Sequence, residues 1–137
     1  KAVFCKDFDS TARVFGKKIP VMGGVLPGLT TDAVAVLLAE ILCVGVVVNA
    51  SKINGVYDKN PSVYSEAKLF SRLTHGELIA LAVKSDERRA GTNFVFDIIA
   101  CKLAARSKIE LRFVDGLDLV ELKNALNGEK WFGTKVV

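Results

Sequence analysis

The segment that most constrains the fold is Val44 to Asn49, a β-branched run with apolar side chains on both of its alternating faces. Such a run is typical of a strand that is covered on both faces, as the strands of parallel sheets are. Parallel strands need long crossover connections, which are usually helices. The run therefore favours an α/β fold, in which the rest of the chain supplies the covering helices.

Strand and helix signals alternate on either side of this run, and helix starts are marked by capping residues. In order, we predict a strand over Lys18–Met22, a helix over Asp32–Cys43 capped by a Thr or Asp, a strand over Val44–Asn49, a helix after the spacing Thr74–Glu77, a helix capped by Asp97, a strand over Lys108–Val114, a helix from Asp118 to about Asn127 and a strand over Thr134–Val137. This alternation predicts a single α/β domain over residues 1–137, a three-layer αβα sandwich with a mainly parallel sheet.

The charge pattern argues against nucleic acid as a partner. The 137 residues carry a net charge of only +4, and the tight basic pairs are Lys17–Lys18 and Arg88–Arg89, of which we expect the second to be a solvated turn. Nucleic-acid-binding proteins usually show a denser basic stripe with interleaved aromatic residues. No apolar run reaches the ~18 residues that a membrane span needs, so we expect no membrane partner.

The cysteines and the histidine do not have the spacing of a metal site. Cys5, Cys43 and Cys101 are far apart, and His75 is the only histidine. An odd number of cysteines without C-x-x-C pairs favours reduced, buried thiols in a cytoplasmic protein. We therefore predict no protein-bound metal centre.

The segment from Met22 to Asp32 has the residues of an anion-binding loop. Gly23–Gly24 ends the predicted strand, Pro27–Gly28 supplies turn chemistry, and Thr30–Thr31 precedes the helix. Glycines let backbone N–H groups approach an anion, and a helix start adds free N–H donors and the positive end of its dipole. Asp32 would repel phosphate, so its expected role is to orient a lysine or Mg²⁺.

A purely structural interpretation of this loop is also open. Thr-Thr-Asp before a helix is an ordinary N-cap, Gly-Gly is an ordinary turn, and no Walker A sequence is present. A second loop over Ser51–Pro61 follows the next predicted strand, and we expect it at the same sheet edge. Its Tyr57 is placed to lie against a base or ribose, with Ser51 and Asn60 as polar contacts, although the spacing alone favours a surface turn with a packed tyrosine.

Taken together, these motifs resemble the archaeal-type uridylate (UMP) kinases of the amino-acid-kinase superfamily. The stretch Lys18–Gly24, the pair Pro27–Gly28 and the stretch Thr30–Ala35 are similar to the UMP-binding segment of that family, and Asn54–Pro61 resembles its D-G-V-Y-x-x-D-P nucleotide loop. Weaker matches follow at Lys68, Leu73–Thr74, Glu77–Leu78, Ala90–Gly91, Asp97, Ala100–Ser107, Gly128 and Gly133–Thr134. The resemblance covers residues 17 to 137, in order and with matching spacing.

The resemblance implies transfer of the ATP γ-phosphoryl group to UMP with Mg²⁺, in a homohexamer in the cytoplasm. It implies that Asp32 organises catalytic lysines and that Ser51, Tyr57 and Asn60 contact ATP. The UMP-binding residues that it implies are Val25, Leu26, Pro27, Gly28, Leu29, Thr30 and Thr31.

The chain departs from the family pattern at several positions. Val25 stands where the family often has Thr, Ser51–Lys52 replaces Thr-Asn, and Asn54 and Asn60 replace aspartates. The lysine and glycine loops of the family's N-terminal half do not occur in residues 1 to 16, and Lys1 is not an initiator Met. We therefore expect the C-terminal half of the fold, inactive alone and poorly soluble because neighbouring strands are missing.

Two other functions fit the same sequence. Another member of the superfamily, an amino-acid or carbamate kinase, would share the fold, but the Pro-Gly-x-Thr-Thr-Asp loop resembles the version that accepts a nucleotide. A non-catalytic nucleotide-binding module would explain both the absent half and the change of aspartate to Asn54 and Asn60.

Overall fold

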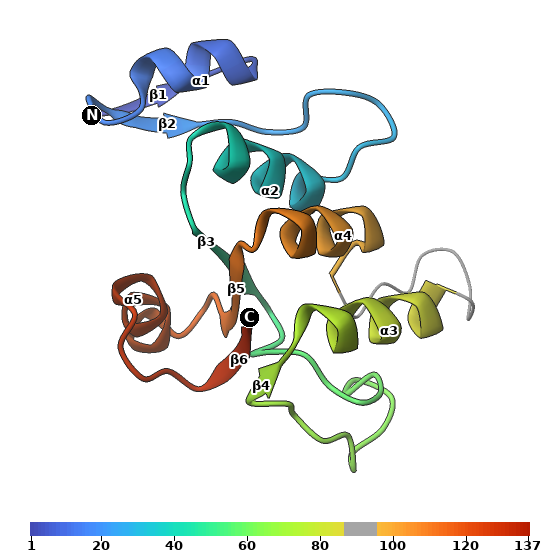
Figure 1. Ribbon diagram of the computed structural model, residues 1–137. Helices are drawn as coiled ribbons and strands as arrows, with labels where there is room; N and C mark the ends of the chain where they lie inside the picture. The colour runs from blue at the N-terminus through green and yellow to red at the C-terminus, as the bar shows by residue number, and fades with distance from the viewer. Residues whose placement is uncertain (87–95) are drawn as a thin grey trace.

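The computed structural model describes residues 1–86 and 96–137. Within these ranges the elements are β1 (Ala2–Phe4), α1 (Phe8–Val14), β2 (Ile19–Val21), α2 (Thr31–Ile41), β3 (Val46–Ser51), β4 (Arg72–Leu73), α3 (His75–Asp86), α4 (Ile98–Ser107), β5 (Glu110–Asp115), α5 (Leu119–Asn127) and β6 (Gly133–Val136) (Figure 1). The predicted solvated turn at Arg88–Arg89 and the motif Ala90–Gly91 lie outside the described residues.

The strands form two separate sheets. The larger sheet has the order β3-β5-β6-β4, and β1 pairs with β2 in a two-stranded sheet. The pairs β1–β2, β3–β5 and β4–β6 are parallel, and β5–β6 is antiparallel. The prediction of a mainly parallel sheet is confirmed, but β2 does not join the sheet that contains β3.

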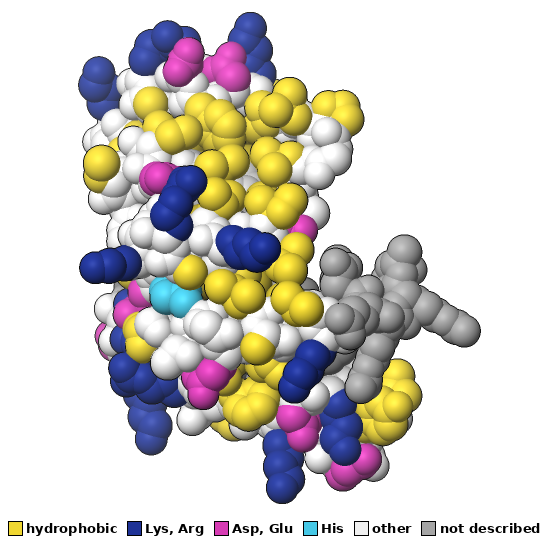
Figure 2. Space-filling view, turned by 45° about the vertical axis from the view of Figure 1, so that its right-hand side comes forward, with side chains coloured by type: hydrophobic (Ala, Val, Ile, Leu, Met, Phe, Trp, Pro, Cys, Tyr) yellow, Lys and Arg dark blue, Asp and Glu magenta, His cyan; other side chains and the backbone are white. Residues whose placement is uncertain are grey.

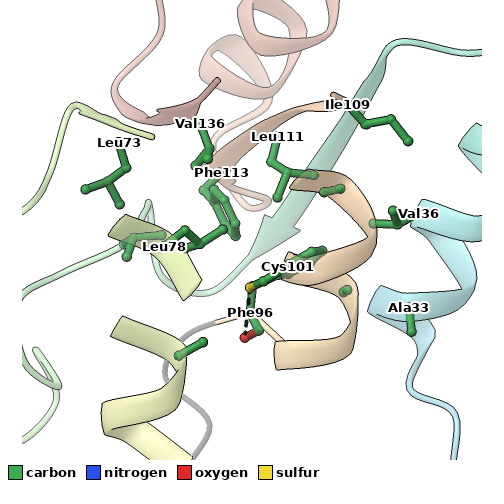
Figure 3. Close-up of a cluster of buried hydrophobic side chains, with 14 of the residues drawn as sticks. Ala33, Val36, Leu73, Leu78, Phe96, Cys101, Ile109, Leu111, Phe113 and Val136 are labelled. Carbon is green, nitrogen blue, oxygen red and sulfur yellow. Dashed lines mark hydrogen bonds between the residues drawn. The ribbon is translucent and has the colours of Figure 1, made fainter. Parts of the chain in front are cut away.

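Helices cover both faces of the larger sheet. On one face, Leu111 and Phe113 of β5 and Val136 of β6 join the hydrophobic core formed with α2, α3 and α4, which includes Cys101 (Figure 3). On the other face lies α5, whose Ala125 is buried (Figure 1). The predicted three-layer αβα arrangement is confirmed.

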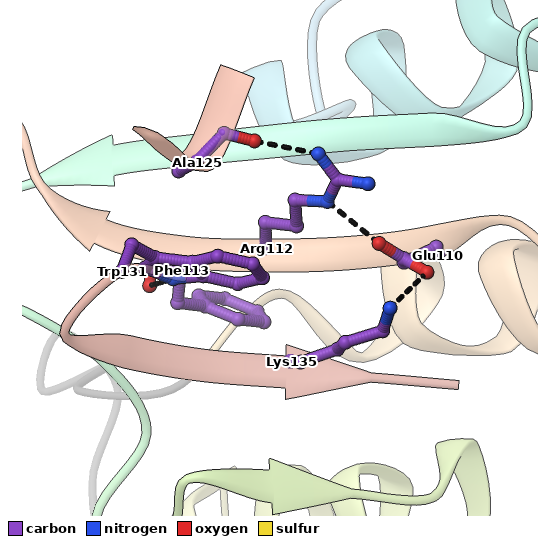
Figure 4. Close-up of polar contacts among 6 residues, drawn as sticks. All are labelled: Glu110, Arg112, Phe113, Ala125, Trp131 and Lys135. Atoms are coloured by element: carbon purple, nitrogen blue, oxygen red, sulfur yellow. Dashed lines mark hydrogen bonds and ion pairs between the residues drawn. The ribbon is translucent and has the colours of Figure 1, made fainter. Parts of the chain in front are cut away.

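The face toward α5 carries a polar network. Glu110 bonds the Arg112 Nε at 2.6 Å and the Lys135 Nζ at 2.8 Å, while Arg112 Nη1 donates to the carbonyl of Ala125 at 2.6 Å (Figure 4). The Arg112 guanidinium also lies 5.5 Å from the centre of the Trp131 ring. Arg112 thereby ties α5 to β5.

The predicted helix caps are confirmed. Thr74 and Glu77 form the reciprocal bonds of a capping box, with Thr74 N–H donating to Glu77 Oε2 at 2.7 Å and Glu77 N–H donating to Thr74 Oγ1 at 3.2 Å. Asp97 accepts a bond from Ala100 N–H at 2.9 Å, and Asp118 accepts from the first turn of α5. Each cap satisfies N–H groups that a helix start leaves without partners.

Two further features differ from the sequence prediction. Strand β1 and helix α1 were not predicted, although Asp7 and Ser10 cap α1 in both directions. Cys43 is exposed, with φ of 54°, because it follows the end of α2, whereas Cys5 and Cys101 are buried as expected. In the described ranges, no helix has the length and apolar character needed to span a bilayer.

Candidate functional site

The loop between β2 and α2 is built around a tight turn. Leu29 N–H donates to the Leu26 carbonyl at 3.2 Å, with Pro27 and Gly28 at the two central positions. Gly28 has φ of +85°, which is the value that a type II turn requires at its third residue and that glycine adopts without strain. The turn thus fixes the exposed backbone just before the helix begins.

The glycines before this turn leave open space above the backbone. No described atom lies within 4 Å of the place where a Cβ would stand on Gly23 or Gly24. Beside them is a groove of about 330 Å³, which is mainly apolar and passes between the end of β2 and the side of α2. Its lining residues are Pro20, Val21, Met22, Gly23, Thr31, Val34, Ala35 and Leu38. The groove gives a ligand access to Gly23 and to Thr31, the first residue of α2.

Hydrophobic side chains surround this part of the surface. Figure 2 shows them gathered over the upper half of one face. Leu26 is 62% exposed and Val21 is 50% exposed, while Val25 and Leu29 are half-buried. The loop therefore offers apolar contact area together with backbone donors.

Thr30 is the N-cap of α2, as the structural interpretation of the sequence anticipated. Its Oγ1 accepts a bond from Ala33 N–H at 3.2 Å, and its carbonyl accepts from Val34 N–H at 3.0 Å. The hydroxyl hydrogen is not used by the cap and can donate to an anion. Thr31 is exposed at the first position of the helix. Capping and anion binding are therefore compatible at this helix start.

Asp32 lies half-buried next to the start of a second helix. Asp97 N–H donates to Asp32 Oδ2 at 3.4 Å, and the Asp97 side chain caps α4. Burial raises the pKa of Asp32, the bond from Asp97 N–H opposes the shift, and the Asp97 carboxylate adds to it. Burial, together with the two carboxylates, also raises the pKa of the nearby Cys101 thiol to about 12. A cation placed beside Asp32 would therefore be bound favourably.

The Asp32 carboxylate is an oxygen ligand of the kind that Mg²⁺ accepts. Mg²⁺ is usually held by one or two carboxylates together with water and substrate phosphates. In the two described ranges, no three His, Cys, Asp or Glu side chains are grouped as metal ligands. Asp32 fits a site in which one carboxylate comes from the protein and phosphates and water supply the other ligands.

The polar groups predicted to contact ATP make local hydrogen bonds. Ser51 Oγ donates to the carbonyl of Ile53 at 2.8 Å, Tyr57 Oη donates to Asn54 Oδ1 at 2.6 Å, and Asn60 Oδ1 accepts from a backbone N–H at 2.9 Å. Tyr57 is half-buried and pairs with Leu69 through an isolated bridge. Each of these three side chains is thus bonded to a residue two or three positions away in the same loop.

The predicted juxtaposition of the two loops at one sheet edge is wrong. Strand β2 pairs only with β1 in the described residues, whereas β3 belongs to the four-stranded sheet. Figure 1 places the loop after β2 and the segment after β3 at opposite ends of the molecule. Alternating elements do not specify which strands are neighbours. Sequence reasoning also missed the contact between Asp32 and Asp97, because the two residues are 65 positions apart and only the cap at Asp97 has a local signal.

Comparisons with known proteins agree on one family. The model of the "Amino acid kinase family" matches residues 11–115. Uridylate kinase of Methanobrevibacter smithii is 39% identical over 120 residues, and that of Methanocaldococcus jannaschii is 43% identical over 111 residues. These alignments cover 88% and 81% of this chain, but 52% and 48% of the relatives.

Solved structures give the same picture. The crystal structure of uridylate kinase from Archaeoglobus fulgidus superposes with a TM-score of 0.81 at 35% identity, covering 99% of this chain and 61% of that one. UMP kinase from Bacillus anthracis, at 17% identity and a TM-score of 0.75, shares the fold. The chain spans about half the length of the curated relatives that it matches. With most of its length matched by the family model, the chain belongs to the amino acid kinase family.

Proposed function

We propose that this chain is the C-terminal half of a uridylate kinase, which transfers the γ-phosphoryl group of ATP to UMP and forms UDP and ADP. The observation that carries the proposal is the loop Met22–Asp32, where open glycines, a type II turn and the start of α2 surround an accessible groove. The relatives that match 88% and 81% of the chain are named uridylate kinases.

In this proposal the loop binds UMP. The residues assigned to that site are Val25, Leu26, Pro27, Gly28, Leu29, Thr30 and Thr31. The backbone N–H groups of the glycines and of the helix start bind the phosphate, with the Thr30 and Thr31 hydroxyls as further donors. The apolar side chains of the loop and groove contact the rest of the nucleotide. The support for this arrangement is the exposed backbone and the neighbouring apolar surface.

ATP is assigned to the loop that follows β3, with Ser51, Tyr57 and Asn60 as its contacts. Phosphoryl transfer needs positioning and charge neutralisation more than a protein nucleophile. Mg²⁺, when bound, supplies part of that neutralisation. Asp32 is the residue assigned to orient the cation or a lysine, because its carboxylate is half-buried next to Asp97 and gains from a positive partner.

The proposal extends to the assembly and the location of the protein. Residues 1–137 form one domain that needs the remaining half of the fold for activity, as the coverage of about half of each relative supports. By resemblance to the family, the complete enzyme is a homohexamer in the cytoplasm.

The test is a chimera in which the N-terminal half of the M. jannaschii relative is joined to this chain. With ATP and Mg²⁺, the chimera should form UDP from UMP, measured by chromatography, and should not phosphorylate glutamate or carbamate. Asp32→Asn should reduce kcat by about 100-fold or more, since it removes a charge that acts in the transition state. Turnover of glutamate or carbamate without turnover of UMP would show a different kinase of the same family.

A calorimetric titration of the 137-residue chain distinguishes the non-catalytic alternative. That alternative is motivated by Asn54 and Asn60, which replace aspartates, and by the bond that occupies the Asn54 side-chain oxygen. Binding of UMP or ATP by the chain, combined with an inactive chimera that still folds, would favour a binding module. An active chimera excludes it.

A further inference from the structure

Thr134 of β6 is a fully buried polar residue that has no role in the site described above. It lies opposite Phe113 in the antiparallel pair β5–β6, on the face of the sheet that contacts the main core. A buried hydroxyl costs free energy unless both its donor and its acceptor capacity are used. The partners of Thr134 are therefore informative.

One partner, Val56, lies within the loop that carries the proposed ATP contacts, and the other, Phe70, is paired with Val56. Thr134 Oγ1 accepts a bond from Val56 N–H at 2.8 Å and donates to the Phe70 carbonyl at 2.5 Å. Phe70 N–H donates to the Val56 carbonyl at 2.9 Å. Val56 and Phe70 thus share one direct backbone bond, and the hydroxyl of Thr134 stands in the position of the second.

Further bonds extend this pairing outward. Asp58 N–H donates to the Lys68 carbonyl at 3.1 Å, Lys68 N–H donates to Asp58 Oδ1 at 2.8 Å, and Tyr57 forms a bridge with Leu69. Residues 56–58 and 68–70 are therefore the two sides of a narrow stem. Tyr57 lies in this stem and Asn60 directly beyond it, and Thr134 closes the stem at its base.

The base of the stem is packed against β6 without free space. A Cβ on Gly55 would lie 2.5 Å from Thr134 Oγ1, and a Cβ on Gly133 would lie 2.1 Å from the Phe113 carbonyl oxygen and 2.8 Å from that of Asn54. Real Cβ atoms do not approach other atoms so closely, so both positions need glycine. This close packing allows the stem only one position against β6. The two hydrogen bonds of the Thr134 hydroxyl fix how the stem is aligned with that strand.

We propose that Thr134 is a positioning residue for the ATP site, because its buried hydroxyl holds the base of the stem that presents Tyr57 and Asn60. Thr134 does not contact the nucleotide. The assignment of ATP to this stem rests on the proposed function, whereas the hydrogen bonds of Thr134 to Val56 and Phe70 are independent of any ligand.

The experiment compares three variants of the chain. Thr134→Val keeps the volume and β-branching but removes the hydroxyl, Thr134→Ser keeps the hydroxyl, and Thr11→Val removes another fully buried hydroxyl, on α1, which bonds the Asp7 carbonyl at 2.9 Å. Amide hydrogen exchange of Val56 is measured without ligand. Mg·ATP and UMP affinities are measured by calorimetry.

In Thr134→Val, Val56 exchange should accelerate about tenfold or more, as expected when a buried N–H loses its acceptor. Mg·ATP should bind about tenfold more weakly, while UMP affinity stays within about twofold. In Thr134→Ser, Val56 exchange and Mg·ATP affinity should both match those of the unmodified chain. Thr11→Val should also leave both values unchanged.

Unchanged Val56 exchange in Thr134→Val would overturn the proposed hold on the stem, whatever the ligand data show. Faster exchange with unchanged Mg·ATP affinity would overturn the positioning role. Equal effects of Thr134→Val and Thr134→Ser would show that the hydroxyl is not responsible. Failure of the unmodified chain to bind Mg·ATP would instead count against the proposed ATP site, and the exchange experiment would still decide whether Thr134 holds the stem.

Discussion

At the scale of single residues, burial of the Asp32 carboxylate costs folding stability, and the same carboxylate is the group proposed to orient a cation or a lysine. Its pKa is raised from 3.8, first by burial and then by the Asp97 carboxylate. A raised pKa means that the folded state holds the proton more tightly than the unfolded state does. The stabilising contribution of Asp32 is therefore complete below pH 3.8 and is lost as the pH rises through the raised value.

Asp32→Asn in the isolated chain removes the cost of burying a charged carboxylate. The variant should be more stable than the unmodified chain at pH 7, by about 0.5 kcal/mol because solvent screens a half-exposed group. The difference should disappear below pH 3.8. Urea unfolding at both pH values measures it. Asp9→Asn is the control, since Asp9 is exposed in the first turn of α1, where a negative charge is favourable. A less stable Asp32→Asn at pH 7 would contradict this prediction, because the surroundings would then favour the charged carboxylate.

At the scale of elements, the Arg112 side chain attaches helix α5 to the sheet. Leu119 and Leu126 of α5 are 73% and 62% exposed, whereas Arg112 is largely buried and donates to the Ala125 carbonyl. Burial alone would raise the pKa of Glu110, but its bonds to Lys135 and Arg112 lower it below the ordinary value of 4.5. The network therefore stabilises α5 above that pH and weakens as the pH falls.

Arg112→Met should accordingly destabilise the chain by about 3 kcal/mol, because it leaves Glu110 and the Ala125 carbonyl without their buried partner. Lys135→Met is the matched control, since its side chain is 36% exposed, and it should cost less than about 1 kcal/mol. Chemical denaturation gives both values. Similar losses in the two variants would show that the network acts as a surface ion pair rather than as the attachment of α5.

The elements also show how far the sequence predicts this fold. Helix starts at Thr74, Asp97 and Asp118 have local capping signals, and the structure confirms them. Strand β1 and helix α1 were missed because β1 has only three residues and the capping box of α1 uses Ser10 in place of Glu or Gln. The separation of β2 from β3, and the contacts of Asp32 and Thr134, depend on pairings between distant segments and have no local signal.

At the scale of the whole molecule, an exposed sheet edge and an exposed apolar face bear on association. Strand β3 is at one end of the larger sheet, so among the described residues one of its edges has no hydrogen-bonded neighbour. In the small sheet, the register pairs Phe4 with Val21 and Ala2 with Ile19, which places these apolar side chains on one face. Phe4 is 76% exposed and Ile19 is 68% exposed. Open edges and apolar faces of this kind promote association.

The isolated 137-residue chain should therefore self-associate, and co-expression with the N-terminal half of the M. jannaschii relative should suppress it. Covering each large apolar side chain would contribute about 1.5–3 kcal/mol, which favours assembly of the two halves. Size-exclusion chromatography with light scattering measures the change. Phe4→Ser with Ile19→Ser should reduce both the self-association and the capture of the other half, whereas Leu117→Ser, at a residue that is 80% exposed away from this sheet, should affect neither. A monomeric chain that unfolds in one sharp transition would contradict the prediction, since these two surfaces would then be stable in water.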